Sequence, residues 1–238
     1  MNKILILVKK ELNSYFNSPL GYIVVSIFLL ITGWLFIQGF FVNSQASMRS
    51  FFGLIPFILM FILPAVTMSS WAEEKRSGTV EVLMTFPVTN FQVVLAKFIS
   101  NFTFLAIMLA LTLAIPSMIS NLGVPDKGII LAGYLGTLLL GASYIAVGLW
   151  ISSVTKNQIV SFITTVAIIF IFYIVGNSFI LDALPAFIGE IGKFLSFSTH
   201  FNSILRGVIS LSDIVYYLSV VLFFLFLNTN VVSSRKWK

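Results

Sequence analysis

The chain has 238 residues, of which 58% are hydrophobic and 9% are charged, and its formal net charge is +6. A typical soluble domain has about 25% charged residues, so the composition excludes an ordinary water-soluble globule, which needs a charged surface. The absence of cysteine excludes disulfide frameworks, thiolate metal sites and cysteine nucleophiles. The 14 lysines and arginines are scattered among apolar runs and form no basic face, so no nucleic-acid partner is predicted.

Residues 3–17 have the spacing of an amphipathic helix. Its apolar face is formed by Ile4, Leu5, Val8, Leu12, Tyr15 and Phe16. Such a helix lies in the headgroup layer with its lysines toward anionic membrane lipid, so we expect an N-terminal amphipathic elbow helix. It should end at Ser18, because the residue before a proline disfavours the α-helical conformation.

Six charge-free stretches are long enough, at about 20 residues, to cross a bilayer as helices. The expected crossings are residues 20–42, 51–72, 98–120, 128–151, 159–181 and 214–232. A single crossing in lipid can satisfy its backbone hydrogen bonds only as a helix, and these runs lack the alternation of β-barrel strands. We therefore predict an all-α polytopic membrane protein with six transmembrane helices in one domain, residues 1–238.

Lysine and arginine are unequally divided between the two sides of these crossings. Ten lie on the side that holds both termini and four on the opposite side. Because the side richer in basic residues faces the cytoplasm, both termini are expected there. The first crossing, with 23 residues, exceeds the apolar core of about 7 to 15 residues of a signal peptide, so we expect it to remain as an anchor.

The connection between the second and third crossings, residues 73–92, combines charge with helix signals. Gly78 allows a break in the chain, and Thr79 can cap a short helix with Glu81 in its first turn, where a carboxylate complements the helix dipole. Pro87 ends that helix. A short charged helix at the membrane surface suits contact with a soluble protein. The alternative is a surface helix whose basic residues only fix the topology.

Further helix signals flank this connection. Thr89 and Gln92 have the spacing of a capping box in front of the third crossing. Pro56 and Pro64 should bend the second crossing. That bend serves either the transmission of motion or ordinary helix packing.

The charged connection resembles the cytoplasmic signature of ABC-2 type permeases in the run EEKRSGTVEVLMTFPVTNFQVVLAK. In that signature an acidic-basic cluster leads to Gly-Thr-x-Glu, a short apolar helix, Pro-Val or Pro-Ile, and a lysine that enters the third crossing. Within the family, the chain is similar to the gliding-motility permease GldF and its NosY-like relatives in the stretch STHFNSILRGVISLSDIVYYLS and the ending SRKW. The resemblance implies an ABC-2 (type V exporter-like) fold in the bacterial inner membrane.

The resemblance also implies partners and a contact site. The chain would be one half of a two-permease core, as a homodimer or beside a related permease, and would work with two copies of an ABC ATPase. Residues 73–86 resemble the coupling helix that contacts this ATPase, and the residues expected to carry the coupling are Glu73, Glu74, Arg76, Gly78, Thr79 and Glu81. The chain contains no GxxxxGK[ST] motif, so ATP and magnesium are expected on the partner. The chain itself is expected to have no enzymatic activity, cofactor or metal.

The connection between the fifth and sixth crossings, residues 182–213, carries two short apolar stripes. They are Ile188, Ile191, Phe194 and Leu195, and then Phe201, Ile204, Leu205 and Val208. Ser198 or Thr199 is available as the helix cap between them. The pair resembles the re-entrant helices that close the outer mouth in the family, and the alternative is two helices lying on the outer leaflet. His200, the only histidine, is expected to be a capping or interfacial residue and is given no chemistry.

The crossings also bear on mechanism. None contains a charged residue, whereas ion-driven carriers usually place ionisable groups inside the membrane. Polar amides such as Gln38, Asn101 and Asn177 either join helices or line a path. The fourth crossing has a nearly bare side, which we expect to pack within the subunit. That side is formed by Gly128, Gly133, Gly136, Gly141 and Gly148.

The sequence therefore favours a permease subunit that couples ATP hydrolysis on a separate ATPase to export or mechanical work, with gliding motility as one such use. The first alternative is a membrane anchor that docks a cytoplasmic complex without transport. The second is a secondary carrier or channel, which the charge-free crossings disfavour. The substrate remains open between a lipid, a hydrophobic compound, a polysaccharide and no solute.

Overall fold

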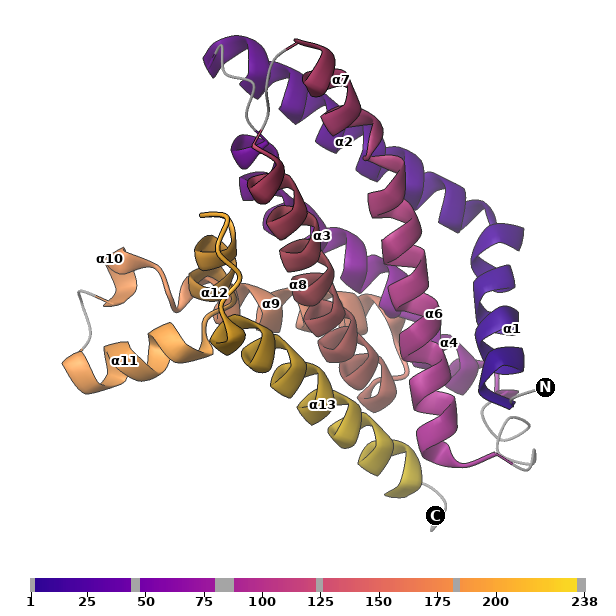
Figure 1. Ribbon diagram of the computed structural model, residues 1–238. Helices are drawn as coiled ribbons and strands as arrows, with labels where there is room; N and C mark the ends of the chain where they lie inside the picture. Colours follow the sequence, from indigo (N-terminus) through magenta and orange to yellow (C-terminus); the bar gives the residue numbers. More distant parts are fainter. Residues whose placement is uncertain (1–2, 44–47, 80–87, 123–125, 182–184, 235–238) are drawn as a thin grey trace.

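The computed structural model describes residues 3–43, 48–79, 88–122, 126–181 and 185–234, and every element in these ranges is a helix (Figure 1). In chain order the helices are α1 Lys3–Asn17, α2 Pro19–Asn43, α3 Arg49–Thr67, α4 Ser69–Arg76, α6 Asn90–Leu111, α7 Ala114–Leu122, α8 Lys127–Val154, α9 Gln158–Ile174, α10 Ser178–Leu181, α11 Ala186–Leu195, α12 Phe197–Ile204 and α13 Leu211–Ser234. The first turn of α1, α4 and the last turn of α13 lie toward the lower right of Figure 1, while α10 and α11 project at the left.

Five helical segments in the described part of the chain are long and apolar enough to cross a bilayer. They are Pro19–Phe40, Arg49–Arg76, Asn90–Asn121, Lys127–Val154 and Leu211–Ser234. The expected fifth crossing, residues 159–181, is instead the 17-residue helix α9 followed by the short α10. Seventeen residues rise about 26 Å, somewhat less than the hydrocarbon core of about 30 Å.

The early end of α9 coincides with a close contact from another part of the chain. The helix stops at Ile174, and a Cβ placed on Gly176 would lie 2.1 Å from the Ser196 hydroxyl oxygen. The start of α12 therefore packs directly against the backbone just beyond α9. This contact comes from a segment about twenty residues farther along the chain, and hydropathy does not reveal it.

Two other expected crossings contain a break. The second divides at Met68 into α3 and α4, and the third divides at Thr112 and Leu113 into α6 and α7. Two predicted helix signals are confirmed: α1 ends at Asn17, just before Ser18, and Thr89 forms a capping box with Gln92 at the start of α6.

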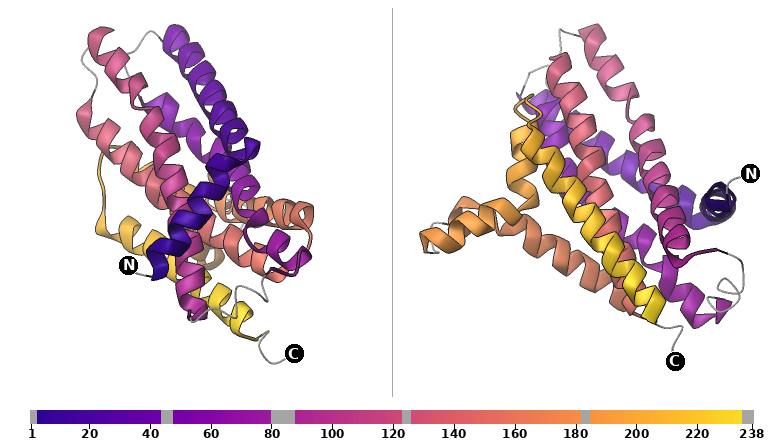
Figure 2. Two further views of the ribbon diagram at one scale, coloured as in Figure 1. Left: turned by 90° about the vertical axis from the view of Figure 1, so that its right-hand side faces the viewer. Right: turned by 60° about the horizontal axis from the view of Figure 1, so that its bottom comes forward.

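Helix α8 lies at the centre of the bundle and contacts α3, α4, α6, α9, α12 and α13 (Figure 2). Its glycines allow these close approaches. A Cβ on Gly133 would lie 2.4 Å from the Phe52 ring, and one on Gly141 would lie 2.3 Å from Cδ2 of Leu105. The prediction that the bare side of this helix packs within the subunit is confirmed for four of its five glycines, whereas Gly128 is exposed.

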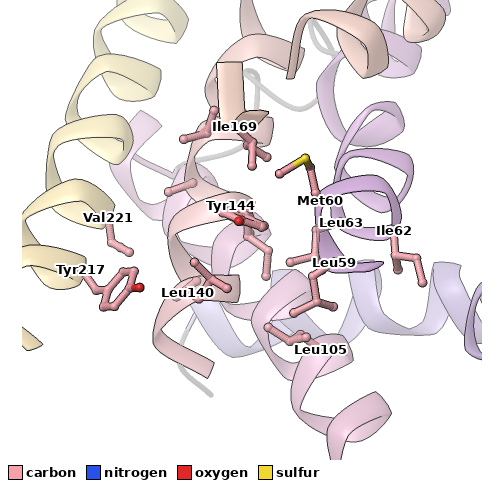
Figure 3. Close-up of a cluster of buried hydrophobic side chains, with 14 of the residues drawn as sticks. Leu59, Met60, Ile62, Leu63, Leu105, Leu140, Tyr144, Ile169, Tyr217 and Val221 are labelled. Atoms are coloured by element: carbon pink, nitrogen blue, oxygen red, sulfur yellow. The ribbon is translucent and has the colours of Figure 1, made fainter. Parts of the chain in front are cut away.

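The core surrounds the middle of α8 (Figure 3). It brings together side chains of α3, α6, α8, α9 and α13, among them Leu59, Leu63, Leu105, Leu140, Tyr144, Ile169, Tyr217 and Val221. Outward faces of α2, α9 and α13 carry many exposed large apolar side chains. Such surfaces are costly in water and suit the hydrocarbon of a bilayer.

Candidate functional site

Helix α4 is the first part of the predicted coupling segment, and its two faces differ. Ser70, Trp71 and Ala72 are buried, whereas Glu73 and Arg76 are exposed. The helix ends where Gly78 takes a φ of +73°, a left-handed conformation that glycine adopts without steric cost. One face of α4 is therefore fixed to the protein and the other is available to a partner.

A buried lysine on α6 fixes the inner face of α4. The ammonium nitrogen of Lys97 lies 2.9 Å from Glu74 Oε1 and 3.2 Å from Glu11 Oε1, and it donates to the Ser70 carbonyl oxygen at 2.8 Å. The same nitrogen lies 4.9 Å from the centre of the Trp71 ring. One side chain thus joins three helices, α1, α4 and α6. We call Lys97, Glu11 and Glu74 the lysine cluster.

Burial sets the strength of the lysine cluster. The Lys97 side chain is only 1% exposed, so its charge has left water and depends on the two carboxylates and the carbonyl oxygen. Lys10, 58% exposed, lies 3.5 Å from Glu11 and 3.7 Å from Glu74 at the solvent edge. Its screened contacts contribute little. The buried lysine is therefore the residue on which the three-helix junction depends.

A chain of hydrogen bonds extends the junction along α1 and α6. The Tyr15 hydroxyl donates to Asn101 Oδ1 at 2.9 Å, and the Asn101 amide donates to the Lys97 carbonyl oxygen at 2.7 Å. Burial raises the pKa of the Tyr15 hydroxyl well above its ordinary value, so this group keeps its proton and remains a donor. Asn101 therefore joins helices, one of the two roles that the sequence left open.

The last turn of α4 also contacts the end of α8. The Lys75 ammonium donates to the carbonyl oxygens of Ser153 and Thr155, where α8 ends. Free carbonyls at a helix C-terminus carry partial negative charge, and a lysine there is favourable. Helix α4 is thus attached to α1, the expected elbow helix, and to the cytoplasmic ends predicted for the third and fourth crossings.

The N-terminal end of α13 takes part in a second group of polar contacts. His200 on α12 lies 2.7 Å from Asp213 Oδ1 through Nδ1 and 3.1 Å from the Phe194 carbonyl oxygen through Nε2, and its ring stacks on Tyr216 at 4.0 Å between centroids. The Ser210 hydroxyl donates to Asp213 Oδ2 at 2.6 Å. These contacts hold α11 and α12 against the start of α13.

The predicted cap between α11 and α12 is wrong by two or three residues. Ser196, not Ser198 or Thr199, is the cap, and its hydroxyl accepts from the backbone N–H groups of both those residues. Ser196 is buried beside Gly176, so tertiary packing decides which of the neighbouring hydroxyls caps the helix.

Replacing His200 with leucine is expected to lower the free energy of unfolding by about 1 kcal/mol, because the hydrogen bond between its ring and Asp213 and the stacking on Tyr216 are lost. Thermal unfolding of the purified chain in detergent measures the change. Arg206→Leu on the exposed turn after α12 is the control and should have no such effect. Equal unfolding midpoints for the His200 variant and the unchanged chain would show that the ring stabilises nothing.

A model of the ABC-2 family of transporter proteins matches residues 10–229, nearly the whole chain. The chain belongs to the ABC-2 family. It is 28% identical over 187 residues to a protein described as a probable multidrug ABC transporter permease, YbhS, from Escherichia coli strain K12, and equally to the protein of that name from Escherichia coli O157:H7. The aligned region covers 78% of this chain and 49% of each relative, so the chain spans about half the length of these curated relatives.

The residues predicted for coupling in this ABC-2 protein do not all face the same way in the structure. Glu73 and Arg76 lie exposed on α4, and Gly78 and Thr79 follow in the exposed turn. Glu74 points inward to the lysine cluster, so it holds α4 in place instead of facing a partner. The sixth residue, Glu81, and the predicted short helix that contains it lie outside the described residues.

Lys97 and Glu11 were not among the predicted site residues. In the division of lysine and arginine between the two sides of the membrane, Lys97 was considered only as a charge that fixes the topology. Two signals pointed to more: Lys97 and Asn101 are one helical turn apart, and Glu11 lies three residues after Val8 and four before Tyr15 on the apolar side of α1. A carboxylate on such a face needs a buried partner.

Proposed function

We propose that this chain is the membrane permease subunit of an ABC transporter, in which α4 receives the motion of a separate ATPase. The proposal rests on the difference between the two faces of α4. Its inner face is attached to α1 and α6 by the buried Lys97, and Glu73 and Arg76 remain exposed on its outer face. A force on the outer face would therefore reach the transmembrane helices through a desolvated ion pair.

The proposal includes a membrane topology. Six crossings, with α9 as the fifth, place both termini and α4 on the cytoplasmic side of a bacterial inner membrane, as the distribution of basic residues favours. Helix α1 is the amphipathic elbow at this surface, beside the lysine cluster. The charge-rich connection at residues 73–92, including the undescribed Glu81, forms the coupling segment, and residues 182–213 form the outer re-entrant segment.

The proposal also includes partners. Two copies of an ABC ATPase supply ATP and magnesium binding, because the chain has no phosphate-binding loop motif of its own. A second permease half, either another copy or a related subunit, completes the core. The relatives' description as probable multidrug permeases favours export of a hydrophobic compound, and the resemblance to the gliding-motility group favours mechanical work.

A membrane anchor is the second candidate. The exposed Glu73 and Arg76 would equally dock a soluble complex that moves no solute. Transport into vesicles with an ATPase-dead partner separates the two functions, because docking survives the loss of hydrolysis and transport does not.

Reversing the exposed charges of α4 is the direct test. Glu73→Lys together with Arg76→Glu is expected to weaken ATPase association by about tenfold, equivalent to about 1.4 kcal/mol, because rim charges then oppose their former partners. Binding is measured with the purified chain in nanodiscs and its co-purified ATPase, and ATP hydrolysis is measured on the same samples.

The matched control is Glu190→Lys together with Lys193→Glu. These two residues have the same spacing and are also exposed, but they lie on α11 at the far end of the molecule. If both double variants bound the ATPase as the unchanged chain does, α4 would not be the contact.

A further inference from the structure

The break between α3 and α4 leaves backbone N–H groups at the start of α4 without hydrogen-bond partners in their own helix. Helix α4 starts after Met68, whose side chain cannot cap a helix, and no side-chain cap is formed there. The first backbone N–H groups of a helix have no partner within it. That of Trp71, the third residue of α4, is buried with a side chain that is 0% exposed, so bulk water cannot serve it.

A hydroxyl from another helix meets this need. Ser152 Oγ, on α8, accepts from the N–H of Trp71 at 3.1 Å and from that of Ala72 at 3.2 Å. The same hydroxyl donates to the Met68 carbonyl oxygen at 2.9 Å. One side chain thus binds backbone groups on both sides of the break and acts as the helix cap that α4 lacks.

The backbone of α8 lies close enough to the end of α3 to keep the Ser152 hydroxyl in this position. One turn before Ser152, a Cβ placed on Gly148 would lie 2.2 Å from Thr67 Oγ1, at the end of α3. Thr67 and Ser152 are both fully buried. The end of α3, the start of α4 and the last turns of α8 therefore meet in one buried, closely packed region.

We propose that Ser152 is a positioning residue that sets the direction of α4 relative to α3 and ties α4 to α8. In the absence of this hydroxyl, α4 would still be held by Lys97 and Lys75, but no side chain would bind the backbone at the break, and the angle between α3 and α4 would vary more widely. With it, a displacement of α4 is carried into α8, the central helix of the bundle. The last statement rests on the proposed function, whereas the geometric role does not.

Ser153 is a matched control on the same helix. It is buried like its neighbour, but its hydroxyl donates at 2.6 Å to the Trp150 carbonyl oxygen of its own helix. Ser152→Ala and Ser153→Ala remove the same atom from adjacent positions. Only the first removes a contact between helices, and Ser152→Thr retains the hydroxyl.

The geometric test needs no ATPase. Because the chain has no cysteine, spin labels can be placed at Phe61→Cys on α3 and Arg76→Cys on α4, both exposed positions, in the full chain in nanodiscs. Ser152→Ala is expected to widen the distribution of distances between them about twofold, as a loosened helix junction would. Ser153→Ala should leave the distribution unchanged, and Ser152→Thr should restore it. An unchanged distribution in Ser152→Ala overturns the proposal.

A second measurement uses the unsubstituted chain and so holds even if Ser152→Ala does not fold. The amide of Trp71 should exchange hydrogen at least about fivefold more slowly than that of the exposed Gly78, the factor that corresponds to a helix cap of about 1 kcal/mol. Equal exchange rates overturn the proposal.

The functional arm is separate. If Ser152→Ala widens the distances and also reduces coupled ATP hydrolysis while ATPase binding is retained, both the positioning role and the proposed function are supported. If Ser152→Ala widens the distances and coupled hydrolysis is unchanged, Ser152 still positions α4. In that case α4 does not transmit the motion of the ATPase, and the proposed function fails.

Discussion

Replacing Lys97 with methionine is expected to lower the free energy of unfolding by about 3 to 5 kcal/mol, because two carboxylates at a three-helix junction lose their buried partner. This corresponds to a fall of about 10 °C in the midpoint of thermal unfolding. The measurement is made on the purified chain in nanodiscs. Coupled ATP hydrolysis should be lost as well, because α4 is no longer attached to α6.

Lys10→Met is the control for this prediction. Lys10 contacts the same carboxylates from the exposed edge, so its loss should change the free energy of unfolding by at most about 0.5 kcal/mol. Combining Lys97→Met with Glu11→Gln and Glu74→Gln should recover part of the lost stability, since no buried charge is then unpaired. Equal effects of the two lysine replacements would show that burial does not govern the cluster.

Gly148→Ala is expected to cost about 2 to 3 kcal/mol through overpacking. The new methyl group would lie 2.2 Å from Thr67 Oγ1, and that hydroxyl cannot turn away easily because it donates to the Leu63 carbonyl oxygen at 2.9 Å inside a helix. The expected result is a lower midpoint of thermal unfolding, with α3 displaced from α8.

Two variants check this interpretation. Gly53→Ala on α3 adds a methyl group where no atom lies within 4 Å, and it should be neutral or stabilising by about 0.5 to 1 kcal/mol. Thr67→Ala in the Gly148→Ala background removes the clashing oxygen and should recover stability. If Gly53→Ala and Gly148→Ala were equally harmful, the close approach of Gly148 to Thr67 would not explain the glycine at position 148.

The long helices could be predicted from the sequence because their cause is local. A run of about 20 apolar residues has to form a helix in lipid, whatever its neighbours are. The capping box at Thr89 and the end of α1 at Ser18 are equally local, and the structure contains both. Membership of the ABC-2 family, first indicated by the charged connection, is confirmed.

The breaks within those helices could not be predicted in the same way. The end of α9 depends on the start of α12 packing at Gly176, and the start of α4 depends on Ser152, 80 residues farther along the chain than Ala72. The proline at position 64 indicated a bend in the second crossing, but only the contact with α8 shows where α4 begins.

The same distinction between local and long-range causes applies to the residues of the candidate site. The exposed Glu73 and Arg76 could be found in the sequence because charge clusters at membrane surfaces are visible in composition. The inward role of Glu74 could not, because its partner Lys97 is on another helix and a charge count does not include burial. The sequence contained the partners but not the information on which of them meet.

We propose that α4 receives motion from a nucleotide-hydrolysing partner. The most direct test of this proposal uses the cysteine-free background to attach a photo-crosslinker at Arg76→Cys in the chain purified with its native partners. We expect a crosslink to an ATP-binding subunit whose yield changes when ATP is trapped before hydrolysis. A crosslink to lipid alone, or one whose yield is the same in every nucleotide state, would contradict the proposal.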